Sequence, residues 1–192
     1  MKSLRKRFKP RLLVVYALAI AALWIASPSP ASILLGLIPI ALGEGLRLWA
    51  TGHLHKNDAL TMTGPYAYLR HPLYLGTLLI ATGFVIMAAH PITLGLYAAF
   101  LIGYFAYYMP YKNRIEGGRL EELYGDAYRR YAVAVPRLVP RLYAYHPLDA
   151  DCGSRDDWQQ ERFADNNEIG TALVVAVGVL LMVTRWAIGA VS

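Results

Sequence analysis

The side chains best suited to chemistry gather in two polar segments, and the first of these spans residues 51–70. It leads into Arg70-His71-Pro72, and Pro72 suits the first turn of a helix because its missing N–H costs nothing there. His71 would then lie at a helix entrance, beside backbone N–H groups that can bind an anion. Alternatively, Arg70 and His71 anchor the chain at a membrane interface, and the nearby tyrosines form an aromatic belt.

The second polar segment follows Pro110. Lys112 and Glu116 are four residues apart, so a helix would place them on one face, where they could hold each other or a polar ligand. Further along, apolar residues recur at i, i+3, i+4, i+7, i+8 and i+11, which predicts a helix lying on the bilayer or docked on a bundle. These residues are Leu120, Leu123, Tyr124, Ala127, Tyr128 and Tyr131.

Two weaker patterns lie outside this pair of motifs. His53 and His55 have the spacing of a metal-ligand pair, but there is no third histidine nearby, so we predict no metal site. Glu44 and Arg47 lie near the end of an apolar run, and their spacing predicts an ion pair within one helix. Ionisable residues at membrane depth are nevertheless functional candidates by default, so Glu44 is retained as one.

The elements that must position these residues are apolar. The chain has 192 residues, 56% of them hydrophobic and 17% charged, whereas soluble proteins carry about 25% charged residues. A helix needs roughly 17–25 apolar residues to cross a bilayer, and unbroken runs lack the alternation of barrel strands. We therefore expect an all-α integral membrane protein, with about five transmembrane helices and one amphipathic helix. The apolar runs are 12–26, 31–50, 73–89, 92–109 and 169–191.

Several classes of protein are disfavoured. Glycine-rich nucleotide-binding motifs and the Gly-x-Ser-x-Gly and His-Glu-x-x-His patterns are absent from the sequence, so we expect no Rossmann sheet. Cys152 is the only cysteine, which excludes an internal disulfide framework and fits a reducing compartment.

The first apolar run could be a signal peptide instead of a transmembrane helix, because it is short and has a basic start.

The charge distribution predicts topology. The net charge of +6 invites a nucleic-acid partner, but 18 of the 19 Lys and Arg residues fall on one side of the alternating apolar runs. The positive-inside rule makes that side cytoplasmic. We therefore expect no nucleic-acid partner, a cytoplasmic N-terminus and a multi-pass protein of a prokaryotic inner (plasma) membrane. Its single membrane domain would comprise a hairpin (1–50), a core (51–142), and a linker with a C-terminal helix (143–192).

Together, the two polar segments resemble integral-membrane methyltransferases of the isoprenylcysteine carboxyl methyltransferase and phospholipid methyltransferase superfamily. The first family motif, a Gly-x-Tyr followed by Arg-His-Pro-x-Tyr, is matched by Gly64 to Tyr66 and by Arg70 to Tyr74. The second is matched, in order, by Glu116, Leu120, Tyr124-Gly125, Tyr128, Tyr131 and Val135 to Pro140. The resemblance covers roughly residues 40–142, with a two-helix hairpin between the motifs.

This resemblance implies methyl transfer from S-adenosylmethionine without a Rossmann fold. The implied cofactor-binding residues are Asp58, Ala59, Leu60, Thr61, Tyr66, His71, Pro72, Leu73, Tyr74 and Glu116. Lys112 aligns with a family arginine that meets the substrate, and Arg114 could compensate for the exchange. The resemblance thus implies Lys112, Glu116 and Arg114 as catalytic residues.

The implied partner is a membrane lipid or a lipidated substrate. Carboxyl O-methylation and amine N-methylation both remain open, as does the oligomeric state. The alternatives are a non-enzymatic scaffold or transporter that retains the fold, and a membrane reductase that uses a nicotinamide cofactor. Saturable binding of S-adenosylhomocysteine separates the methyltransferase from the scaffold.

Overall fold

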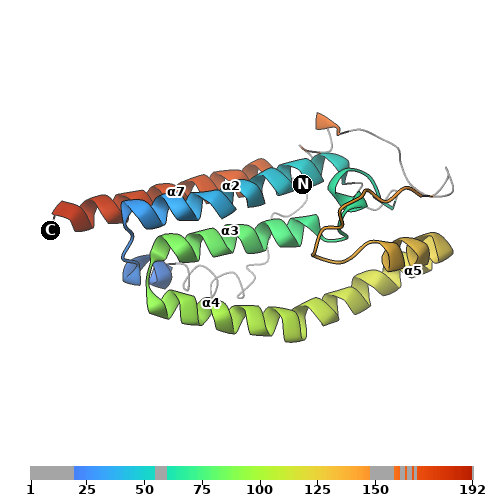
Figure 1. The fold of residues 1–192 in the computed structure, drawn as a ribbon, viewed down its shortest axis with the longest axis horizontal. Coiled ribbons are helices and arrows are strands. Elements are labelled where there is room, and N and C mark those ends of the chain that lie inside the picture. Colours follow the sequence, from blue (N-terminus) through green and yellow to red (C-terminus); the bar gives the residue numbers. More distant parts are fainter. Residues whose placement is uncertain are drawn as a thin grey trace, which may run out of the picture.

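The computed structural model describes residues 20–54, 60–147, 158–160, 163, 166 and 168–191. Within these residues the chain is helical and contains no β-strand. Helices α2, α3 and α7 run side by side, and α4 leads into α5 along the opposite flank of α3 (Figure 1). The main helices are α2 (Pro30–His53), α3 (Pro72–Ala88), α4 (Pro91–Gly103), α5 (Met109–Ala134) and α7 (Glu168–Val191). The expected all-α fold is therefore confirmed for the described residues.

Proline and capping residues define where the helices begin. Ser29 caps α2 through a reciprocal capping box with Ser32, and Pro30 follows in the first turn. Such a box satisfies backbone N–H groups that have no partner inside the helix. Pro72 and Pro91 likewise open α3 and α4. The Ser27 amide donates to the Ala88 carbonyl at 2.9 Å, so the two uncharged turns lie at the same end of the bundle.

Glycines allow α2 and α3 to pack closely along their length. A Cβ atom added at Gly36 would lie 2.5 Å from the Gly83 carbonyl oxygen, and one added at Gly43 would lie 2.6 Å from that of Gly76. Small residues at such contacts let helix backbones approach each other within a membrane. Helix α7 covers this pair on one side, where Val175 and Met182 join a cluster with residues of both helices.

Helices α4 and α5 form one continuous helical run that passes through Pro110, the residue that follows the fourth apolar run. Five residues, Tyr104–Tyr108, form a π-helical turn called η2 between them. The Met109 amide donates to the Tyr104 carbonyl across this wider turn. Proline in a regular helix clashes with the carbonyl four residues earlier, so the wider turn accommodates Pro110 without ending the helix. The run bends later at Gly125, whose φ is 52°.

Three helices are long and apolar enough to cross a membrane: Pro30–His53, the continuous run Pro91–Ala134, and Glu168–Ala190. Helix α3 is apolar but has only 17 residues, which is at the lower end of the range for a span. Of the first predicted span, residues 20–25 are helical and residues 12–19 lie outside the described part. The expected membrane helices are thus supported at three positions, and the total of five is not established.

Candidate functional site

The two sequence motifs meet at the end of the bundle where α3 begins. A short 3-10 helix, η1 (Gly64–Ala67), precedes α3, and the segment that follows α5 folds back against this region. The Arg70 amide donates to the Pro136 carbonyl at 2.8 Å, and the His71 amide donates to the Arg137 carbonyl at 3.0 Å. These backbone bonds clasp the entrance of α3 to the chain beyond α5, so the motifs form one site.

Glu116 is the centre of this site. Its carboxylate accepts a hydrogen bond from Lys112 Nζ at 2.9 Å, and the Tyr74 hydroxyl donates to its two oxygens at 3.2 and 3.4 Å. The side chains of Lys112 and Glu116 are 34% and 36% exposed. The structure therefore brings together residues from α3 and α5, and leaves the Glu116 carboxylate accessible to a ligand.

His71 lies beside this carboxylate in a more buried position. Its ring stacks on that of Tyr74 with 5.2 Å between centroids. The side-chain amide of Asn113 has hydrogen-bond partners for both its nitrogen and its oxygen in one orientation. In this orientation the nitrogen donates to His71 Nε2 at 3.1 Å, and the oxygen accepts two bonds of 2.9 Å from the Arg137 guanidinium. Nε2 is then an acceptor, which places the proton of the neutral ring on Nδ1. Burial lowers the pKa of His71, and the negative charge of Glu116 opposes this shift.

Tyr66 is a buried residue of η1 that connects the site to α5. Its backbone carbonyl accepts a 2.7 Å hydrogen bond from the Tyr131 hydroxyl of α5. Burial raises the pKa of the Tyr66 phenol, with smaller effects from the charges of Arg47 and Glu168. The Tyr66 hydroxyl therefore remains protonated at neutral pH and can serve as a hydrogen-bond donor.

The remaining predicted residues have varied positions. Pro72 is buried, and Leu73 is half-buried in the first turn of α3. Leu60 and Thr61 are buried, and Leu60 packs in a cluster with Tyr131. Arg114 is exposed, and two residues along a helix place it on a different face from Lys112. Asp58 and Ala59 lie outside the described residues.

The entrance of α3 offers fewer free amides than the sequence suggests. The amides of Arg70 and His71 bond to the segment after α5, and those of Tyr74 and Leu75 both bond to the His71 carbonyl at 3.1 Å. An anion at this helix start would have to compete with these bonds. Side chains around Glu116 are therefore better placed than backbone N–H groups to recognise a charged ligand.

Arg47 does not pair with Glu44, so the expected intrahelical ion pair is wrong. Its Nε and Nη2 atoms bind the two carboxylate oxygens of Glu168 at 2.6 and 3.0 Å. Both Glu44 oxygens are buried and have no hydrogen-bond partner within the described residues. Glu168 prevails because its carboxylate meets the guanidinium in a bidentate arrangement, which is the strongest geometry for such a pair. This contact joins residues 121 positions apart, so local spacing could not reveal it.

Sequence reasoning also missed Asn113 and assigned no role to Arg137, although Arg137 lies within the second motif. Asn113 directly follows Lys112 in the chain, and its only sequence signal is this proximity to the motif. No metal-binding group is found in the structure: within the described ranges, no three His, Cys, Asp or Glu side chains lie together. His53 is buried, and its ring packs against Gly64, whereas His55 lies outside the described part.

Comparisons with known proteins match the stretch of chain that contains most of this site. The family model for phospholipid methyltransferase matches residues 42–127. A cobalt-zinc-cadmium resistance protein, CzcN, from Cupriavidus metallidurans is 32% identical over 61% of this chain and 53% of its own. Protein-S-isoprenylcysteine O-methyltransferases B and A from Arabidopsis thaliana are 33% and 31% identical, each over 55% of this chain and 57% of their own.

The chain thus spans about half the length of the curated relatives it matches. No solved structure matches it significantly. The matched residues include Tyr66, His71, Tyr74, Lys112 and Glu116, so the resemblance and the geometry concern the same part of the molecule. Residues 42–127 thus resemble the phospholipid methyltransferase family, and the chain is similar to isoprenylcysteine O-methyltransferases over about half of its length.

Proposed function

We propose that the protein transfers a methyl group from S-adenosylmethionine to a lipid or lipid-like substrate at the cytoplasmic face of a membrane. The observation that carries this proposal is the accessible Glu116 carboxylate, held by Lys112 and Tyr74 within the segment that matches the methyltransferase family.

The residues present fit the methyl donor. Glu116 can pair with the ammonium at the amino-acid end of the methyl donor, because the Glu116 side chain is 36% exposed. The bonds from Lys112 and Tyr74 hold the carboxylate in place. The stacked rings of His71 and Tyr74 offer aromatic faces to the adenine or the sulfonium cation. When bound, S-adenosylmethionine supplies an electrophilic methyl group, which passes to the substrate nucleophile as the carbon–sulfur bond breaks.

Lys112 favours an acceptor that carries negative charge. Its ammonium now faces Glu116 at 2.9 Å, and it becomes available to an anionic group once Glu116 pairs with the methyl donor. A carboxylate acceptor attacks without first losing a proton, whereas an ammonium must be deprotonated. His71 Nε2 is already occupied by Asn113, so it is a poor base for an amine. We therefore favour carboxyl O-methylation over N-methylation.

The location follows from charge and helix arrangement. The uncharged turns at Ser27–Pro30 and Ala88–Pro91 share one end of the bundle, and the site lies toward the other end, near the basic segments. The positive-inside rule makes the basic side cytoplasmic. The apolar helices beside the site would let a lipid substrate approach from within the bilayer.

Calorimetric titration with S-adenosylhomocysteine, on the full chain purified in detergent, tests the proposal. We expect saturable binding that weakens about tenfold in Glu116→Gln, which loses one charge-assisted contact. Glu121→Gln is a matched control, because Glu121 pairs with Arg129 on an exposed face of the same helix. Absence of saturable binding, or equal affinity of Glu116→Gln and the parent, would contradict the proposal.

A further inference from the structure

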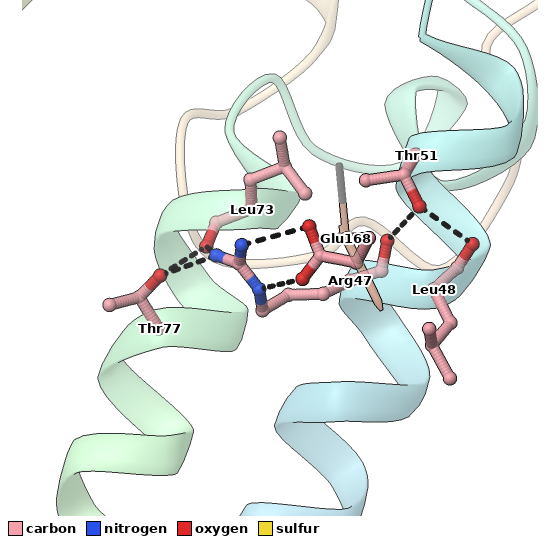
Figure 2. Close-up of polar contacts among 6 residues, drawn as sticks. All are labelled: Arg47, Leu48, Thr51, Leu73, Thr77 and Glu168. Carbon is pink, nitrogen blue, oxygen red and sulfur yellow. Dashed lines mark hydrogen bonds and ion pairs between the residues drawn. The ribbon is translucent and has the colours of Figure 1, made fainter. Parts of the chain in front are cut away.

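Arg47 connects three helices in a single set of contacts (Figure 2). From α2, its guanidinium reaches Glu168 in the first turn of α7 through two hydrogen bonds. Its third nitrogen, Nη1, donates to the Thr77 hydroxyl at 2.7 Å and to the Leu73 carbonyl at 3.2 Å, both on α3. Thr77 itself donates to Leu73 at 2.9 Å. We name this set the Arg47 junction: Arg47, Glu168, Thr77 and Leu73.

The ion pair of the Arg47 junction is largely buried, whereas Thr77 is exposed. The side chains of Arg47 and Glu168 are only 14% and 3% exposed. Breaking a buried pair by removing one partner is costly, because the other charge is left uncompensated. Lysine could not replace Arg47, because an ammonium lacks the planar array of N–H donors that binds a carboxylate and a neighbouring helix at the same time.

The Arg47 junction lies directly behind the candidate site. Leu73 is followed by Tyr74, whose hydroxyl donates to Glu116 on the other side of α3. The charges of Arg47 and Glu168 also act on the buried Tyr66 phenol. The first turn of α3 is thus held from two sides: by Arg47 at Leu73 and Thr77, and by the backbone clasp at Arg70 and His71.

We propose that Arg47 and Glu168 are positioning residues for the methyl-donor site, an inference that rests on the proposed function. Glu168 orients the Arg47 guanidinium, and Arg47 holds the first turn of α3 so that Tyr74 meets Glu116. This gives α7 a role that the family match does not cover, because the match ends at residue 127. The C-terminal helix therefore contributes to ligand binding without touching the ligand.

The test measures the dissociation constant of S-adenosylhomocysteine in Glu168→Gln, in Tyr74→Phe and in the double variant. We expect Glu168→Gln alone to raise this constant about tenfold, in line with losing a charge-assisted pair. If the Arg47 junction acts through Tyr74, the same substitution has little further effect in the Tyr74→Phe background. If Glu168 has a purely structural role, Glu168→Gln lowers thermal stability in both backgrounds. The effects of Glu168→Gln and Tyr74→Phe on the dissociation constant are then independent, and their coupling energy is zero.

Two further variants keep the inference open to contradiction if Glu168→Gln fails to fold. Thr77→Val removes one Arg47 contact while sparing the ion pair, and we expect about threefold weaker binding. Thr184→Val on α7 is its control, because that hydroxyl bonds to the carbonyl of Leu180 in its own helix. Parent-like affinity in Glu168→Gln or Thr77→Val, with the parent binding normally, would overturn this inference alone. Absence of binding by the parent would overturn the proposed function as well.

Discussion

Replacing Gly43 by alanine should destabilise the α2–α3 contact, and the structure gives the size of the effect. The added Cβ would lie 2.6 Å from the Gly76 carbonyl oxygen, 2.9 Å from Ile80 Cγ1 and 3.1 Å from the Ile80 nitrogen. Two of these neighbours are backbone atoms of a helix, so they cannot turn aside as a side chain can. Relief to an ordinary contact of 3.4 Å requires the helices to separate by about 0.8 Å.

Such overpacking costs about 1–3 kcal/mol, which lowers Tm by roughly 2–12 °C for a chain of this size. Thermal unfolding of the purified protein, followed by circular dichroism, measures the change. Gly45→Ala is the matched control on the same helix, because its added Cβ meets nothing within 4 Å. Alanine favours a helix over glycine by roughly 0.5–1 kcal/mol, so this control should be slightly stabilised. Equal Tm values for the two variants would refute the close approach of α2 and α3.

Three other predictions concern the site. Tyr74→Phe removes the hydroxyl that donates to Glu116, and it should weaken S-adenosylhomocysteine binding about three- to tenfold in calorimetry; unchanged affinity would exclude a role for this bond. Lys112→Met should raise the KM for an anionic acceptor at least tenfold while binding of S-adenosylhomocysteine stays within threefold; equal loss of both would contradict a role for Lys112 in acceptor binding. Burial lowers the pKa of His71 below 6.5 in the folded protein. The folded protein is therefore not penalised for burying the neutral ring above pH 6.5. Stability falls as the pH drops from 6.5 through the pKa that His71 has in the folded state, because the unfolded chain then binds a proton more readily. Tm should therefore fall more steeply with acid in the parent than in His71→Gln, and parallel pH profiles would argue against a buried neutral ring.

Local sequence signals predicted the parts of the fold that depend on neighbours in the chain. Pro72 begins α3 as predicted, because its fixed φ angle and missing N–H suit the first turn of a helix. The i, i+4 spacing of Lys112 and Glu116 predicted their contact at 2.9 Å. The apolar face of α5 was also largely predicted, because Leu120, Tyr124, Tyr128 and Tyr131 pack in one cluster. Leu123 departs from the prediction and is exposed.

Contacts between distant segments could not be predicted in the same way. Glu44 is three residues from Arg47, yet Arg47 pairs with Glu168 from a helix far along the chain. Helix packing decides this choice, and no short-range spacing encodes it. The π-helical turn at Tyr104–Tyr108 was missed for a related reason. Proline normally ends a helix, and only the surrounding structure shows that the chain continues through Pro110.

The most direct test of the proposed activity is methyl transfer itself. The full chain in detergent would be incubated with S-adenosylmethionine carrying a labelled methyl group and a membrane lipid extract, and label in the lipid fraction would be counted. We expect label above the protein-free control for the parent and for Glu121→Gln, and a loss of at least tenfold for Glu116→Gln. No label with the parent, or equal labelling by Glu116→Gln and the parent, would contradict methyl transfer at the Glu116 site.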